Sequence, residues 1–140
     1  MKRTSDDHYM IHVIETIISL QNAVEEQRAA HRYRYLLYPM NLLGDSIPIL
    51  LFLKEGELFK AYHFIDVKGY GTVFFRVESI HNFHLTLRLL KPLNASGELI
   101  HLFNEDQICF VKRLLKTENF IKVDVSNSCA IQCLSPQMLT

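Results

Sequence analysis

The stretch Thr72–Lys91, TVFFRVESIHNFHLTLRLLK, alternates between apolar and polar residues along two successive segments. The apolar positions are Val73, Phe75 and Val77 in the first segment and Leu85, Leu87 and Leu89 in the second. Alternation with a period of two is typical of strands that bury one face. The stretch therefore predicts an antiparallel β-hairpin.

The loop of this hairpin has to keep both apolar faces on the same side of the sheet. We expect a three-residue loop, His81-Asn82-Phe83, because it sets Val77 opposite Leu87. A two-residue loop in a regular ladder would set Val77 opposite Thr86 and mix the two faces.

The length and charge of the chain limit the number of domains and the kinds of partner that we expect. The chain has 140 residues, which predicts one domain over 1–140, with residues 1–9 and 137–140 as flexible tails. Lys and Arg number 15, and so do Asp and Glu, so no net field attracts nucleic acid or anionic lipid. A net charge of zero instead favours association between copies. No apolar run is long enough to predict a membrane span.

Residues 7–28 have the spacing of an amphipathic helix. The apolar stripe consists of Met10, Val13, Ile14, Ile17, Ile18, Leu20 and Val24. Docking on a sheet accounts for such a stripe. Its breadth leaves a second hypothesis open, in which Ile14 and Ile18 pair helices of neighbouring copies.

The segment Arg28–Tyr38 mixes basic residues with tyrosines. Its aromatic residues Tyr33, Tyr35 and Tyr38 are candidates for self-association. The same composition is compatible with a solvated connection whose tyrosines cover the sheet. An alternative function follows from it, a small β-barrel that binds single-stranded nucleic acid or another ligand through this segment.

Further strands are predicted before the central hairpin. Ile47–Leu53 is apolar on both faces, which indicates a strand covered on both sides, and Pro48 should stand at its start. We expect Leu58–Phe64 to return as the partner strand of a second hairpin. Gly69 and Gly71 then bracket a loop.

The C-terminal part mixes short elements. Glu98–Phe103 predicts a short strand, and Asn104 is a helix cap, but residues 104–115 fit either helix or strand. Phe120–Val125 and Cys129–Cys133 alternate as strands do. The expected fold class is α+β, with one N-terminal helix on a mainly antiparallel sheet, or partly closed barrel or sandwich, of six to eight strands.

No catalytic, cofactor-binding or metal-binding constellation emerges from the residues. Cys109 lies in an apolar stretch, where a cysteine is most often a small buried hydrophobe. The histidines His8 and His12 share a helical face but lack a third ligand nearby. We therefore predict that the protein is not an enzyme and needs no cofactor.

The tail Cys129–Pro136, CAIQCLSP, resembles the C-terminal signature of the CotY/CotZ/ExsY family of spore coat and exosporium proteins of bacilli. Further stretches similar to the family follow in the expected order, and they are Ala23–Gln27, Ser46–Pro48, Phe75–Ile80 and Lys122–Val125. The resemblance spans about residues 10–138 of the chain.

The resemblance implies a non-enzymatic building block of the outer layers of the spore. It is made in the mother cell, is deposited on the spore surface and assembles into oligomers or two-dimensional lattices reinforced by disulfides. Its partners are copies of itself and other coat or exosporium proteins, with no nucleic acid.

The cysteine content departs from that of the family. Relatives are rich in cysteine, whereas this chain has Cys109, Cys129 and Cys133 alone. Cys129 and Cys133 match the family signature and are cross-link candidates together with Cys109. Buried, unpaired thiols are the alternative. Because other cysteine positions are lost, the resemblance implies an assembly held mainly by packing.

Overall fold

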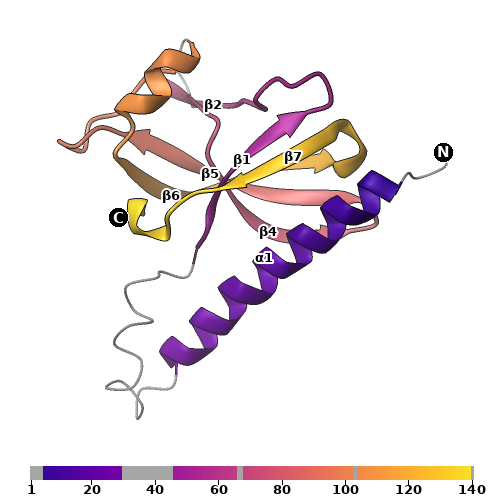
Figure 1. Cartoon of the computed structure of the whole chain (residues 1–140). Coiled ribbons are helices and arrows are strands. Elements are labelled where there is room, and N and C mark those ends of the chain that lie inside the picture. The colour runs from indigo at the N-terminus through magenta and orange to yellow at the C-terminus, as the bar shows by residue number, and fades with distance from the viewer. Residues whose placement is uncertain (1–4, 30–45, 66–67, 103, 140) are drawn as a thin grey trace.

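The computed structural model describes residues 5–29, 46–65, 68–102 and 104–139. One long helix, α1 (Ser5–Ala29), is followed by short strands and 3-10 helices (Figure 1). The strands are β1 (Pro48–Leu53), β2 (Ala61–Ile65), β3 (Lys68–Thr72), β4 (Phe75–His81), β5 (His84–Leu93), β6 (Arg113–Asp124) and β7 (Ser128–Cys133). The 3-10 helices are η2 (Glu105–Phe110), η3 (Val125–Asn127) and η4 (Pro136–Met138).

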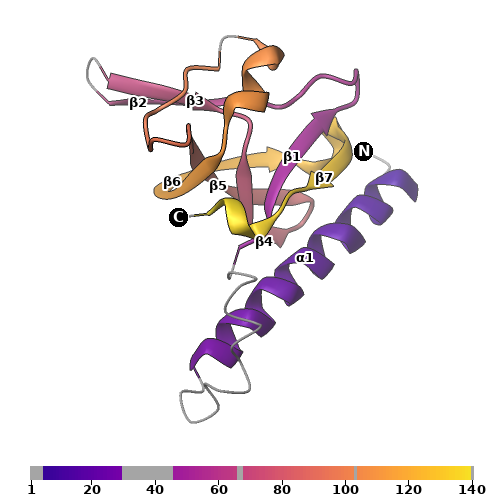
Figure 2. The same cartoon turned by 60° about the vertical axis from the view of Figure 1, so that its left-hand side comes forward.

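The strands form two antiparallel sheets. Five of them lie in the order β6-β5-β4-β1-β7, and β2 pairs with β3 in a separate ribbon. The edge strands β6 and β7 are joined by the short helix η3, so the five-stranded sheet curls without closing (Figure 2). The predicted α+β class is confirmed, with an open curled sheet rather than a closed barrel.

The central hairpin has the predicted register but a different turn. Phe75 faces Leu89 and Val77 faces Leu87, as expected. The prediction of a three-residue loop is wrong, because the turn consists of two residues with positive φ, Asn82 at 49° and Phe83 at 66°. A register shift between Val77 and Ser79 absorbs the difference, since it leaves one residue, Glu78, without a partner in the ladder.

Helix α1 packs on the sheet along a narrow stripe. Its buried residues are Met10, Ile14, Ile17, Gln21 and Val24. Leu20, which the helical wheel placed in the stripe, is 53% exposed, and the polar residue Gln21 is 2% exposed. The helix begins at Ser5, within the segment that we expected to be a tail.

Two hydrophobic cores lie on opposite faces of the sheet. Helix α1 contributes Ile14 to the first, where it packs with Leu51 of β1 and Leu87 of β5. The second core, around Phe74 and Leu90, is closed in part by side chains of η2 and η4. Strand β1 belongs to both cores, which confirms the prediction that it is covered on both sides and begins at Pro48.

The predicted partner of β1 is wrong. Leu58 forms a single bridge with Phe52, after which the chain leaves β1 and pairs as β2 with β3. The glycines Gly69 and Gly71 belong to β3 and not to a loop. The partners of β1 are β4 and β7, which lie far away in the sequence.

The ambiguous segment 104–115 contains both kinds of element. Asn104 caps η2, since its side chain accepts from Asp106 N and its own backbone N–H donates to the side-chain oxygen of Gln107. Strand β6 then begins at Arg113. The short strand predicted before Asn104 is reduced in the described residues to one bridge, from Leu93 to Leu99.

Candidate functional site

The cross-link candidates are exposed on two elements. Cys129 and Cys133 lie on β7, at the edge of the sheet, and Cys109 lies on η2. All of them are free and exposed, so the expectation of a buried Cys109 thiol is wrong. Cys109 Sγ donates to the carbonyl of Asp106 at 3.0 Å within the short helix.

Cys129 stands at an irregularity of β7. The register shifts between Phe52 and Leu53 of β1, so Ala130 faces Phe52, Ser128 faces Leu53, and Cys129 between them has no partner. The thiol of Cys129 donates to the carbonyl oxygen of Leu53 at 3.0 Å. An S–H group is a weak donor, so this contact does not prevent Cys129 from reacting.

Cys133 lies at the other end of β7, opposite Ile49 of β1. Burial raises the pKa of the Cys133 thiol, because the neighbouring protein removes part of the water that would stabilise the thiolate. The thiol is therefore accessible but less ionised at neutral pH than an ordinary cysteine.

The helix residues proposed for self-association face the core. Ile14 is fully buried against the sheet, and Ile18 packs against the same core from its edge. We therefore remove Ile14 from the candidate contact surface, because it offers no exposed area. The tyrosines Tyr33, Tyr35 and Tyr38 lie outside the described residues, so their roles, including the nucleic-acid alternative, stay predictions.

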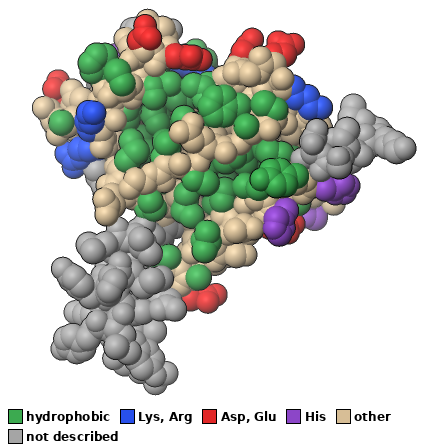
Figure 3. Space-filling view, viewed as in Figure 1, with side chains coloured by type: hydrophobic (Ala, Val, Ile, Leu, Met, Phe, Trp, Pro, Cys, Tyr) green, Lys and Arg blue, Asp and Glu red, His purple; other side chains and the backbone are tan. Residues whose placement is uncertain are grey.

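Large exposed hydrophobic side chains lie elsewhere, at positions that sequence reasoning missed. They are Tyr9 and Leu20 on α1, Tyr62 and Phe64 on β2, Phe110 on η2, and Leu115 and Phe120 on β6. Hydrophobic side chains also gather over the face on which β7 lies in front (Figure 3). Single exposed apolar residues are common on folded proteins, so only those that gather in a patch are candidates for a contact surface.

The β2–β3 ribbon presents two of these rings as a plate. Tyr62 and Phe64 are stacked, with centroids 5.9 Å apart and ring planes 12° apart. They face Gly71 and Gly69 across the ribbon, where the absence of a side chain leaves room for the rings. Alternation of aromatic residues opposite two glycines was the sequence signal that could have revealed this plate.

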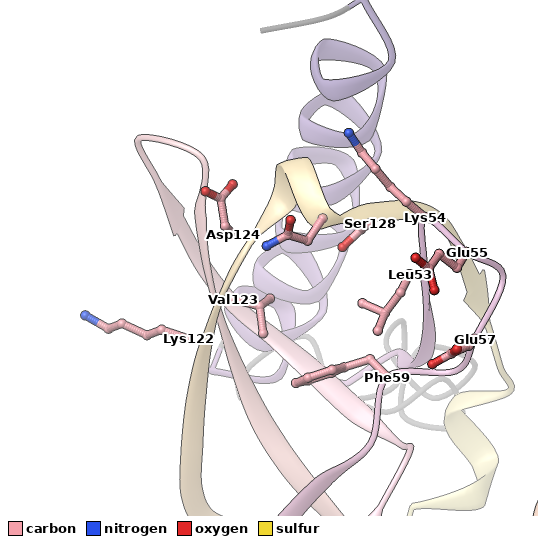
Figure 4. Close-up of a pocket in the computed structure, with 10 residues that line it drawn as sticks. Leu53, Lys54, Glu55, Glu57, Phe59, Lys122, Val123, Asp124 and Ser128 are labelled. Carbon is pink, nitrogen blue, oxygen red and sulfur yellow. The ribbon is translucent and has the colours of Figure 1, made fainter. Parts of the chain in front are cut away.

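A hollow of about 530 Å³ lies where the end of β1 approaches the end of β6 (Figure 4). Leu53, Phe59 and Val123 form its apolar floor. Its charged residues are Lys54, Glu55, Glu57, Lys122 and Asp124. This mixture of signs favours neither an anionic nor a cationic ligand, and the two lysines extend away from the hollow.

The described residues also contain no group of three or more histidines, cysteines or carboxylates that could hold a metal ion. None of the helices in the described part of the chain is long and apolar enough to cross a membrane.

Comparison with known proteins decides the family. The family model of spore coat protein Z matches residues 2–136. The chain belongs to the spore coat protein Z family. Spore coat protein Z of Bacillus subtilis (strain 168) is 35% identical over an alignment of 130 residues that covers 90% of this chain and 88% of the relative. No solved structure matches the chain significantly.

Membership of the spore coat protein Z family confirms the resemblance seen in the tail and places the protein in the spore coat. The family supports a structural role for this protein in the spore coat.

Proposed function

We propose that the protein is a non-enzymatic structural unit of the spore coat that associates with copies of itself and with other coat proteins. The observation that carries this proposal is the placement of large exposed hydrophobic side chains at opposite ends of the molecule. Tyr9 is 68% exposed on α1, and Phe64 is 78% exposed on the β2–β3 ribbon.

An extended assembly needs more than one contact surface on each copy. Helix α1 and the β2–β3 ribbon lie at opposite ends in both views (Figures 1 and 2). A contact through one end therefore leaves the other end free for a further copy. The equal numbers of acidic and basic residues remove the net repulsion between copies. Both features support oligomers or a two-dimensional lattice.

Modest contacts suffice in such an assembly, because each copy is held at several places at once. Exposed aromatic plates such as Tyr62 with Phe64 bury apolar area with little loss of side-chain entropy. The proposed mechanism is thus packing between repeated surfaces, with thiols as a secondary reinforcement.

The experiment is assembly of the full chain, followed by negative-stain microscopy and light scattering as the concentration rises. We expect sheets or rings from the natural sequence and a clear loss of assembly from the double variant Tyr62→Ser, Phe64→Ser. The control variant Ala95→Ser changes an exposed turn residue and should assemble normally. Circular dichroism verifies that each variant is folded.

The role of the thiols is separated by repeating the assay with reductant and with the variant Cys129→Ser, Cys133→Ser. Unchanged assembly means that packing carries the contacts. A natural chain that stays monomeric at high concentration and is absent from purified spores contradicts the proposed function.

A further inference from the structure

Two histidines flank the turn of the central hairpin and face each other across it. His81 ends β4, His84 begins β5, and the two are paired in register. Both residues are exposed. Side chains directly opposite each other in an antiparallel pair have Cβ atoms about 4.5–5.5 Å apart. Two imidazole rings that start from this separation can both reach one metal ion, because a Zn–N bond is about 2.0–2.1 Å long.

The turn between the two histidines is held from two sides. Asn82 and Phe83 both have positive φ, which is the conformation of a tight two-residue hairpin turn. The carbonyl oxygen of Phe83 accepts from Val125 N at 2.9 Å, and the Phe83 ring contacts the ring of His8 on α1, with centroids 6.0 Å apart. The backbone that carries the pair is therefore ordered before any ligand binds, which lowers the entropy lost on binding.

A carboxylate continues the row of facing side chains onto a third strand. Asp124 of β6 is paired in register with His84. The next pair along these strands, Leu85 with Val123, packs in the core under α1. Because successive side chains of a strand point to opposite faces, His84 and Asp124 project from the other face of the sheet, and His81 shares that face as the partner of His84.

The carboxylate of Asp124 is held beside the histidine pair. Its Oδ1 accepts from the backbone N–H of Ser126 at 2.9 Å and from the Ser126 hydroxyl at 2.7 Å. Lys122, the nearest charged residue along β6 on the same face, extends away from Asp124 (Figure 4). The negative charge next to His84 favours a bound cation and orients the imidazole, as carboxylates behind metal-bound histidines do.

One polar contact competes with a metal ion at this pair. Asn82 Nδ2 lies 3.3 Å from Nε2 of His81, on the exposed surface of the turn. Hydrogen bonds from nitrogen to an acceptor are usually about 2.7–3.2 Å long, so this contact is weak. A metal ion that binds Nε2 displaces the amide at little cost, since water can replace the contact.

We propose that His81 and His84 together bind a divalent transition metal ion of the kind that imidazole prefers, such as Zn²⁺, with Asp124 as the orienting carboxylate. The two imidazoles fill half of a four-coordinate shell, and water molecules complete it. The described residues hold no set of three protein ligands, so the site is an exchangeable surface site. This inference goes beyond the proposed coat function and does not depend on self-association.

The test measures Zn²⁺ binding to the full chain by isothermal titration calorimetry, with protein prepared without a histidine tag. Exposed thiols also bind zinc, so the parent chain carries Cys109→Ser, Cys129→Ser and Cys133→Ser. All variants are made in this parent, and circular dichroism verifies that each of them is folded.

The hairpin variant is His81→Gln, His84→Gln. The matched control is His8→Gln, His12→Gln, which removes two exposed histidines that lie four residues apart on α1 and could also share a metal ion. A third variant, Asp124→Asn, removes the negative charge but keeps the side-chain oxygen that accepts from Ser126.

We expect saturable binding of Zn²⁺ by the parent chain and by the helix control, and a loss of more than about tenfold in affinity in the hairpin variant. Asp124→Asn should weaken binding by about tenfold. In NMR spectra of the imidazole groups, Zn²⁺ should shift the signals of His81 and His84 and leave that of His101 unchanged.

A parent chain that binds no Zn²⁺ overturns the proposal, and so does an equal affinity of the hairpin variant and the helix control. Unchanged affinity in Asp124→Asn overturns the role of that carboxylate. Assembly of the natural chain, recorded by negative-stain microscopy without added metal, tests the proposed function separately, so a failure of zinc binding leaves that function intact.

Discussion

The side-chain amide of Gln21 donates a hydrogen bond to the carbonyl oxygen of Val77 at 2.8 Å, which joins the helix to the irregular point of the central hairpin. The same amide accepts from the backbone N–H of Ile47 at 2.9 Å. Gln21 is 2% exposed and lies among apolar helix residues. It thus holds α1, β4 and the start of β1 together by satisfying backbone groups that a regular ladder would have paired.

The first prediction concerns this bridge. Gln21→Ala leaves the carbonyl of Val77 and the N–H of Ile47 without these partners, and each buried group left unpaired costs about 1–3 kcal/mol. We expect a matching fall in the free energy of unfolding, measured by urea denaturation. Asn22→Ala, at the exposed neighbouring position, is the control and should change stability little.

The second prediction concerns two arginines that face each other across β4 and β5. Arg76 and Arg88 are paired in register, and Glu78 lies 2.9 Å from the first and 2.7 Å from the second. Glu78→Ala removes the carboxylate that both guanidinium groups share, and the loss of these charged hydrogen bonds should destabilise the fold by about 1.5–3 kcal/mol. Thermal and urea unfolding measure the loss.

Glu118→Ala is the matched control for this pair. Glu118 also contacts Arg88, at 3.3 Å, but its side chain is 88% exposed. An exposed ion pair contributes about 0–1 kcal/mol. Equal losses from Glu78→Ala and Glu118→Ala would contradict the assigned role of Glu78.

The third prediction concerns the glycines under the aromatic plate. A Cβ atom at Gly69 would stand 2.7 Å from the carbonyl oxygen of His63, which is backbone and cannot move freely. A Cβ atom at Gly71 would stand 3.0 Å from side-chain atoms of Lys60 and Tyr62, which can shift. Gly69→Ala should therefore destabilise the ribbon more than Gly71→Ala, as measured by hydrogen exchange of β2 and β3. The reverse order would contradict this geometry.

The fourth prediction concerns the pH dependence of Cys133. Partial burial raises its pKa above that of an ordinary cysteine, so alkylation by iodoacetamide in a Cys109→Ser, Cys129→Ser variant should have a higher pH midpoint in the folded chain than in the unfolded chain. In the unfolded variant the midpoint should return to the ordinary value. Mass spectrometry of samples quenched at each pH follows both reactions.

The same shift affects stability in one direction. Because the folded-state pKa of Cys133 is higher than the unfolded one, the contribution of the neutral thiol to stability is complete below the unfolded pKa and is lost as the pH rises through the folded pKa. Cys133→Ser should remove this part of the alkaline loss of stability. An unchanged pH profile in that variant would contradict the partial desolvation of the thiol.

Periodicity predicted the elements whose pattern is local. Helix α1 and the register of Phe75 with Leu89 follow from side-chain spacing alone. A hairpin that buries one face fixes the register, because a slip by one residue would move every apolar side chain to the exposed face. The two-residue turn was missed because an irregularity at Glu78 restores the register, and such irregularities have no clear sequence pattern. The ribbon was missed because Gly69 and Gly71 usually indicate loops.

The candidate contact surfaces were less predictable. Apolar spacing on α1 suggested Ile14 as a residue for self-association. Spacing alone cannot tell which part of a broad apolar stripe faces the sheet. In the structure Ile14 is buried and Leu20 is exposed. The cysteines Cys129 and Cys133 were singled out by their similarity to a family signature. Their place at an open sheet edge depends on strand order, which the order of residues along the chain does not reveal.

The chain itself determines a helix, a set of amphipathic strands and membership of the spore coat protein Z family, since these depend on residue types at short spacing. Tertiary structure alone decides that β7 crosses to β1 and becomes an edge, that Gln21 is buried, and that Tyr62 and Phe64 face solvent. The physical reason is that strand partners far apart in sequence are chosen by the burial of the whole core and not by any local pattern.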